Sequence, residues 1–298
     1  MRKGLTMEEK VNALIKEIKQ EENKETIAIK LIPNTKVSLT SSNVAGVFYL
    51  PKTDSIPVNE NGEQLMYLAQ INCEELPANN IYPKTGIMQF WIFGGDVNTD
   101  SGLGKCTSDI NKRVIYYPTI KEHYNVEELA DIYRPNEAVR GELISSICKN
   151  APFAMVFEKT KQWVTPQDFR FEKIFDEKWK KYFANNISLS SLFDIDYETA
   201  SYILDELYTE NHIQIGGYGI FGEFDIDPRR FFDDDGNNPH ENYTELLFQI
   251  YFKFRDEFVI SDNFDVFKYS YGVGNFFATR DQLKNLDFEE CLYTWYRG

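Results

Sequence analysis

The sequence contains few of the residues that form disulfide, redox or metal sites. Its four cysteines lie far apart without a C-x-x-C pair, and none of its three histidines stands at a spacing typical of metal ligands. We therefore predict no metal site and no cofactor. Widely spaced cysteines also favour reduced, buried thiols in a cytoplasmic protein over structural disulfides. The cysteines are Cys73, Cys106, Cys148 and Cys291.

Positive charge and long apolar runs are also scarce. The chain carries 32 Lys and Arg against 47 Asp and Glu, which gives a formal net charge of −15. Nucleic acids and anionic membranes attract clustered basic residues, so neither is a predicted partner, whereas a basic protein partner is compatible. No run of 18 apolar residues occurs, and the N-terminus lacks an apolar signal region. Because both features are absent, we predict that the chain is not exported and does not span a membrane.

Apolar and aromatic side chains are abundant. Hydrophobic residues make up 42% of the chain and aromatic residues 15%, including 23 Phe and 18 Tyr. This content is enough for one large core, and it favours a β-rich structure because aromatic rings suit pleated, half-buried surfaces. The negative charge is uneven, since residues 223–265 hold twelve acidic and four basic side chains, a net charge of −8.

Hydrophobic periodicity predicts both helices and strands. Thr6 and Glu9 have capping-box spacing, Asn125 is a suitable N-cap, and Pro166 suits a first helical turn. The predicted helices are 6–24, 125–133, 136–147, 165–183, 196–211 and 280–285. The predicted strands of the first part are 26–33, 36–40, 46–51, 67–71, 86–95, 113–118 and 153–159.

A weak internal repeat links the two parts of the chain. A glycine-led stretch, an L-x-Q-I strand and a glycine-led aromatic strand follow one another at 46–51, 68–71 and 86–93. The same order recurs at 216–221, 247–250 and 272–279. Chance recurrence is the alternative to duplication.

The repeat leads to a fold prediction. We predict an α+β fold with a duplicated mixed or antiparallel β core, two related halves and peripheral helices. The chain is then a single domain, 1–298, with a first half of about 26–160 and a second half of about 161–298.

A G-x-G-x-x-G pattern at Gly217, Gly219 and Gly222 raises the question of dinucleotide binding. That chemistry needs a helix directly after the glycines, and Pro228 with its acidic neighbours opposes one. We interpret the glycines as a turn between strands.

Two further motif matches fail on their residues. GLGKCT (102–107) lacks the first glycine and the Ser or Thr of a phosphate loop. Asp233, Asp235 and Asn237 alternate like EF-hand ligands, but Thr244 occupies the bidentate glutamate position. A solvated acidic loop is the better interpretation, with adventitious cation binding as the alternative.

The polar candidates are two glutamines and an Arg-carboxylate pair. Gln70 and Gln249 each lie in an L-x-Q-I strand, where a buried amide needs hydrogen-bond partners. We predict that they clamp backbone at the junction of the halves, with a bridge across it and ligand recognition as alternatives. Asp225 and Asp227 alternate on a predicted strand beside Arg229 and Arg230, where an Arg-carboxylate ion pair that fixes the turn is favoured over catalysis.

Long ordered stretches of the sequence resemble the YwqG-like bacterial family, whose domain has no known function. They are NENGEQLMYLAQINCEELP (59–77), YPKTGIMQFWI (82–92), FAMVFEKTKQWVTPQDFRFEKIF (153–175), IGGYGIFGEFDIDPR (215–229), LLFQI (246–250) and GVGNFFATRDQLKNLDFEECLYTW (272–295).

The resemblance implies an α+β fold with a duplicated core and supplies no established reaction. Lys268 and Ser270 replace the Trp and Asp that usually precede GVGNFF, so this chain lacks a family carboxylate. Members of the family can occur near polymorphic-toxin genes, which suggests an immunity or antitoxin-like role by analogy.

We therefore predict a non-enzymatic protein-binding module that uses its acidic segment toward a basic partner. The alternative is an enzyme or small-ligand binder with a cleft between the halves. No catalytic residues are assigned. The candidate binding residues are Gln70, Gln249, Tyr218, Phe221, Asp227, Arg229, Phe231, Asp233, Asp234 and Asp235.

Overall fold

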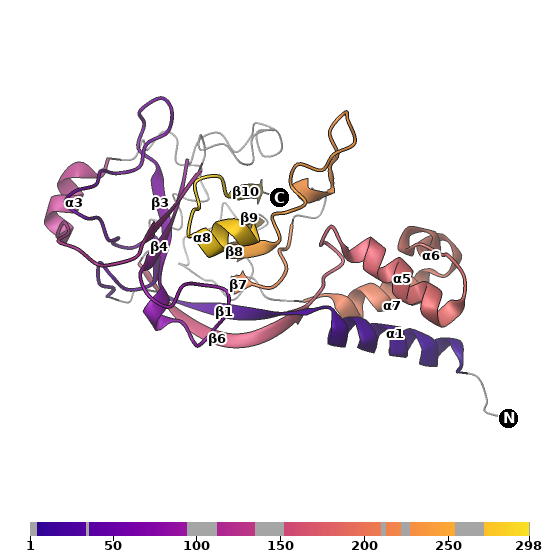
Figure 1. Ribbon diagram of the computed structural model, residues 1–298. Helices are drawn as coiled ribbons and strands as arrows, with labels where there is room; N and C mark the ends of the chain where they lie inside the picture. Colours follow the sequence, from indigo (N-terminus) through magenta and orange to yellow (C-terminus); the bar gives the residue numbers. More distant parts are fainter. Residues whose placement is uncertain are drawn as a thin grey trace.

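A ten-stranded sheet and a group of helices form the computed structural model (Figure 1), which describes residues 5–33, 36–93, 112–134, 152–209, 213–221, 227–253 and 271–297. The strands are β1 (Asn23–Pro33), β2 (Asn43–Val44), β3 (Met66–Asn72), β4 (Ile87–Ile92), β5 (Lys112–Tyr117), β6 (Phe153–Trp163), β7 (Gln214–Gly216), β8 (Glu245–Lys253), β9 (Tyr271–Ala278) and β10 (Leu292–Arg297). The α-helices are α1 (Met7–Glu21), α3 (Val126–Ile132), α5 (Phe171–Phe183), α6 (Leu189–Ile195), α7 (Tyr197–Leu207) and α8 (Arg280–Asn285).

The two longest strands, β1 and β6, lie at the centre of the sheet. Its order is β10-β9-β8-β7-β1-β6-β2-β3-β4-β5, and all described pairings are antiparallel. We call β2–β5 the first arm and β7–β10 the second arm. The coarse prediction, helices combined with an antiparallel sheet, is confirmed. No described strand pair is parallel, so the mixed alternative is not seen.

The order of the strands in the sheet differs from their order in the chain. β1 precedes the first arm in sequence but pairs with β7 of the second arm, and β6 precedes the second arm but pairs with β2. β1 therefore lies beside the second arm, which follows β6 in the chain, and β6 lies beside the first arm, which follows β1. Residue 160, where the predicted halves divide, lies within β6.

The arms face each other across one apolar core. The Phe90 ring of the first arm lies 4.8 Å from the Phe248 ring and 5.0 Å from the Phe276 ring of the second arm, measured between centroids. The Tyr82 hydroxyl also donates to the Leu247 carbonyl oxygen at 2.6 Å. Burial of this apolar surface holds the arms together.

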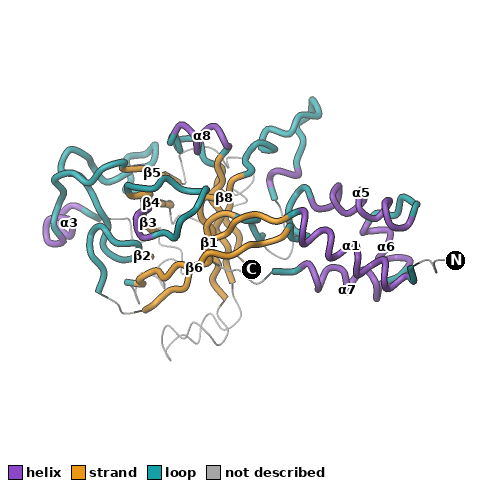
Figure 2. The backbone as a smooth tube through the Cα atoms, turned by 60° about the horizontal axis from the view of Figure 1, so that its bottom comes forward, coloured by secondary structure: helices purple, strands orange, loops and turns teal. Residues whose placement is uncertain are grey.

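A helical lobe lies at one end of β1 and β6 (Figures 1 and 2). It comprises α1, α5, α6 and α7, whose apolar faces bury Leu14, Phe175, Trp179 and Ile203 in a second core. The predicted capping box is confirmed, since Thr6 and Glu9 bond reciprocally and α1 begins at Met7. The lobe is thus packed around its own core.

Several predicted elements are absent or shifted. Residues 36–40 and 46–51 are not strands, and side chains of β3 bond the Leu39 and Thr40 carbonyls and the Tyr49 amide. The predicted helix from 165 begins only at Phe171, since Asp168 and Phe171 close successive turns, and Pro166 therefore lies outside its first turn. The predicted helix 136–147 lies outside the described residues. β10 and α6 were not predicted.

Candidate functional site

Gln70 is fully buried on β3 and holds two backbone segments in place. Its side-chain Oε1 accepts from the Tyr49 amide at 3.0 Å, and its Nε2 donates to the Leu39 and Ser41 carbonyls at 2.9 and 2.8 Å. These segments precede β3 in the first arm and cover the face of the strand opposite the shared core. Gln70 thus clamps backbone, but within its own arm.

Gln249 has the corresponding position on β8. Its Oε1 accepts from the Ile220 amide at 2.7 Å, so it fixes the segment after β7 as Gln70 fixes the segment after β2. Neighbouring contacts recur as well: Gln89 donates to the Tyr49 carbonyl, and Asn275 donates to the Ile220 carbonyl. The described bonds of both glutamines stay within their arms and do not form the predicted bridge across the junction.

The glycines after β7 form a tight turn. Gly216 and Gly217 have φ values of 70° and 72°, a region that favours glycine, and the Gly217 amide donates to the Glu25 carbonyl at 3.1 Å. Residues 217–221 continue without a helix, so no helix N-terminus follows Gly217 and Gly219 in the described chain. Gly222 lies outside the described residues.

A buried ion-pair cluster follows this segment. The sequence predicts Asp227 on a strand, but Asp227 is instead the N-cap of a 3-10 helix, Pro228–Arg230. Arg229 forms a forked ion pair with the Asp227 carboxylate, in which Arg229 Nε lies 2.8 Å from Oδ1 and Nη2 lies 2.7 Å from Oδ2. The predicted ion pair that fixes the turn is therefore present. Charge-assisted forked bonds of this kind have strict geometry.

Asp168 and Arg170 complete the cluster from the turns before α5. Asp168 is fully buried, accepts two bonds from Arg170 and lies 3.4 Å from Arg229 Nη2. Burial raises the pKa of the Asp168 carboxyl, but the hydrogen bonds and charges of Arg170 and Arg229 outweigh it and hold the pKa below its usual value. Sequence reasoning missed both residues because it assigned 165–183 to one helix. The turn-forming Pro166 and Asp168 were the available signal.

Aromatic rings surround the Arg229 guanidinium, whose central carbon lies 4.2 Å from the Phe277 ring centre and 4.7 Å from that of Phe169. Phe221 is buried at 5.7 Å from the same carbon and stacks on Phe277. Tyr218 is also buried and donates to the Glu22 carbonyl at 3.2 Å. The candidates Tyr218 and Phe221 therefore belong to the interior around the cluster.

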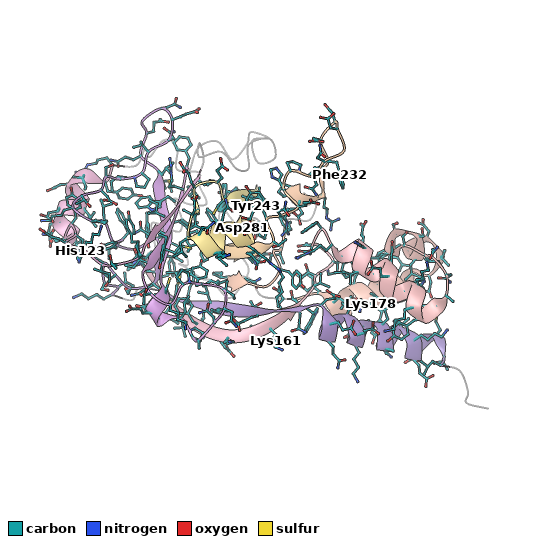
Figure 3. All side chains as sticks on the ribbon, viewed as in Figure 1. His123, Lys161, Lys178, Phe232, Tyr243 and Asp281 are labelled. Atoms are coloured by element: carbon teal, nitrogen blue, oxygen red, sulfur yellow. The ribbon has the colours of Figure 1, made fainter. Side chains whose placement is uncertain are left out.

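The remaining candidates lie on a projecting segment that we call the acidic loop, residues 231–241 (Figure 1). Its Phe231 and Phe232 side chains are 50% and 69% exposed. Asp233, Asp234 and Asp235 follow directly and are exposed. Figure 3 shows Phe232 on this segment and Tyr243 nearer the sheet. The sequence-predicted binding residues thus separate into buried supports and one exposed group.

The acidic loop is held by its own hydrogen bonds and by the cluster beneath it. Asp233 Oδ1 accepts from the amides of Asp235 and Asn237, at 3.1 and 2.7 Å. At the base, Asn238 donates to the Arg229 carbonyl, and Arg229 Nη1 donates to the Tyr243 carbonyl at 3.2 Å. Arg229, which precedes the loop, therefore bonds Asn238 in its second half and Tyr243 just after it, while Asp227 neutralises the Arg229 charge.

The described ranges bear on metal binding and on membrane insertion. No group of three or more His, Cys, Asp or Glu residues within them could hold a metal ion. In the same part of the chain, no helix combines the length and apolarity needed to cross a membrane. Cys73 and Cys291 are buried there, whereas Cys106 and Cys148 lie outside it.

Comparison with known proteins identifies a family. The model of a family described as a domain of unknown function (DUF1963) matches residues 42–296. This range begins just before β2 and ends within β10, so it includes both arms, the acidic loop and the ion-pair cluster. No curated protein is a significant match for the chain.

Proposed function

Because the chain belongs to the DUF1963 family, whose function is unknown, we propose a function from its contacts: a non-enzymatic module that binds a basic protein through the acidic loop. The observation that carries the proposal is the exposure of Phe231 and Phe232 beside three exposed aspartates. Aromatic side chains are common anchors in protein interfaces, and complementary charge speeds encounter. The YwqG-like name and an immunity-like role, both drawn from resemblance, belong to this proposal.

The support beneath the loop favours binding over simple solubility. Its turn is fixed by Asp233, and its C-terminal side is fixed to Arg229 through Asn238 and Tyr243. A loop that is ordered before binding loses less conformational entropy when it meets its partner. An acidic segment that served solubility alone would not need such a base.

The alternative function, an enzyme or small-ligand binder with a cleft between the arms, gains no support from the contacts. Phe90, Phe248 and Phe276 pack against one another where that cleft was predicted. Gln70 and Gln249 bond backbone on the faces of β3 and β8 that lie opposite the shared core. The polar groups that would hold a ligand are therefore occupied and point away from the junction.

We also infer that the two arms arose by duplication. Three features support this inference: the strand order on either side of β1 and β6, the recurring Gln70 and Gln249 bonds, and a register shift at Leu68 in β3 and at Leu247 in β8. Both of these leucines enter the shared core. The acidic loop and its ion-pair cluster belong to the second arm, so this arm would have gained the binding surface.

Binding to basic proteins encoded by adjacent genes tests the proposal. Each candidate is purified and its Kd is measured by calorimetry against the native chain and the double variant Asp234→Lys/Asp235→Lys. This variant keeps Asp233, which holds the turn, so the loop is expected to stay ordered. We expect the Kd to rise at least tenfold, with a steeper effect at low salt.

A matched control is Glu60→Lys/Asp131→Lys, which makes the same charge change at exposed sites of the first arm. Phe232→Ala removes an aromatic anchor without a change in charge and should also weaken binding, by roughly tenfold. If no adjacent gene product binds, or if the control weakens binding as much as the loop variant, the proposal fails.

A further inference from the structure

Lys24 lies near the start of β1, where the sheet meets the helical lobe. Its Nζ donates to the Thr244 carbonyl at 2.8 Å and lies 5.2 Å from the centre of the Tyr218 ring. The central guanidinium carbon of Arg170 lies 5.1 Å from the same ring centre. Two cations from distant parts of the chain therefore converge on one aromatic ring.

Two of the carboxylates near this ring already have cationic partners. Asp168 accepts from Arg170 and pairs with Arg229, and Glu245 accepts from Arg280 Nε at 3.0 Å. Within the described residues, no carboxylate lies within ion-pair distance of Lys24. Lys24 therefore faces the cationic Arg170 without an ion-pair partner of its own.

The ionisation of Lys24 reflects its burial and its cationic neighbours. Burial first, and the positive charge of Arg170 second, lower the pKa of Lys24 to about 8. The charge of Arg229 lowers it further, whereas Glu245 and Asp168 oppose the shift. A bound anion would remove this penalty.

We propose that Lys24 and Arg170 form a binding site for a small oxyanion beside the Tyr218 ring. The ligand class is a phosphate or carboxylate group, which accepts hydrogen bonds from ammonium and guanidinium donors. Arg170 uses Nε and Nη2 for Asp168, its side chain is 28% exposed, and its Nη1 makes no hydrogen bond to the described residues. Lys24 and this nitrogen would supply the donors, independently of the acidic loop.

Linkage gives the site a measurable signature. An anion binds the protonated Lys24 more tightly than the neutral amine, so binding must raise the pKa of Lys24, and affinity must fall as the pH rises through about 8. A tenfold preference for the protonated form corresponds to a rise of one unit. Glu245, Asp168, Arg170 and Arg229 are the charged groups that face the ammonium and set the starting value.

The test follows lysine ε-carbon NMR signals of the full-length protein during pH titrations. Titrations with inorganic phosphate, acetate and chloride are compared at equal ionic strength. We expect phosphate or acetate, but not chloride, to raise the Lys24 midpoint by about one unit, and the more effective ion identifies the ligand class. The signal of the exposed Lys30, on the same strand, serves as an internal control.

Variants provide the second readout. Lys24→Met should weaken the selected anion's binding at least tenfold in calorimetry, whereas Lys30→Met makes the same charge change at an exposed position and should leave it unchanged. The proposal is overturned if the Lys24 midpoint is the same in all three salts. It is also overturned, as an adventitious ion only, if chloride or the Lys30 signal shows the same response.

Discussion

At the scale of single residues, Arg229 is a fully buried cation whose cost of desolvation is offset by its partners. Asp227 supplies two short bonds, and three aromatic rings surround the guanidinium. A buried ion pair is weak evidence of net stabilisation, but removal of one partner leaves an uncompensated buried charge. Arg229 is thus better understood as the residue that sets the local geometry than as a source of stability.

Replacement of Arg229 by Met is therefore expected to destabilise the protein by about 3–5 kcal/mol, because Asp227 remains buried without its partner. Arg280→Met, which removes a solvent-exposed arginine from its pair with the partly buried Glu245, should cost about 1 kcal/mol or less. Urea unfolding curves would measure both changes. The double variant Asp227→Asn/Arg229→Met should recover part of the loss, and equal stability of the single and double variants would contradict this account.

Glu17 on α1 carries the expected acid sensitivity of the helical lobe. Hydrogen bonds from Lys181, Tyr182 and Lys178 lower the pKa of Glu17 from 4.5 to about 2. A carboxyl whose pKa is lower in the folded state stabilises the protein above its unfolded pKa and loses this effect as the pH falls. The contribution is thus present above about pH 4.5 and is lost between about pH 4.5 and 2.

Glu17→Gln should remove that part of the acid dependence. Its stability at pH 7 is expected to fall by about 1 kcal/mol, and its stability between pH 4.5 and 2 should decline less steeply than that of the native chain. Thermal unfolding followed at several pH values measures this slope. Glu177→Gln, at an exposed position of α5, should leave the slope unchanged, and an identical effect of both variants would refute the assignment.

At the scale of elements, the turn after β7 depends on glycine for two reasons. Gly217 has φ 72°, and an added Cβ would lie 2.1 Å from Gln162 Oε1 and 2.4 Å from Thr26 Oγ1. Gly62 has a similar φ of 78° but nothing within 4 Å of an added Cβ. The two positions therefore separate backbone strain from steric overlap.

Gly217→Ala is expected to lower stability by more than Gly62→Ala, which should cost only the strain of a left-handed residue, about 1 kcal/mol. The difference arises because Gln162 must move, and its Oε1 also accepts from the Tyr218 amide at 2.7 Å. Chemical denaturation of both variants measures the difference. Equal losses would show that the overlap with Gln162 is relieved without cost.

Elements with strong local signals could be predicted from the sequence. The capping box of α1 and the largely apolar runs of β3 and β4 are local patterns, and the structure reproduces them. β2 and β7 have two and three residues, too few for an alternation to be recognised. Sequence also could not show that Gln70 would bond residues 46–51 or that Asp168 would meet Arg229, since both depend on contacts distant in the chain.

At the scale of the whole molecule, the exchanged positions of β1 and β6 tie the two arms together. All described strand partners of β1, namely β6 and β7, come from the later part of the chain. The described partners of β6, β1 and β2, come from the earlier part. Neither the earlier nor the later part of the chain therefore contains a described strand that pairs with its own long strand, even though each part contains most of one arm.

We accordingly expect that a chain divided between Arg134 and Pro152, for example into 1–143 and 144–298, yields two fragments that fold only together. Separately, each would expose the long edge of β1 or β6 and half of the core around Phe90 and Phe248, and both exposures favour aggregation. Co-expression should give a 1:1 complex with the circular dichroism spectrum of the intact chain. A fragment that is monomeric and cooperatively folded alone would contradict this prediction, because its arm would then be stable without the exchanged strand.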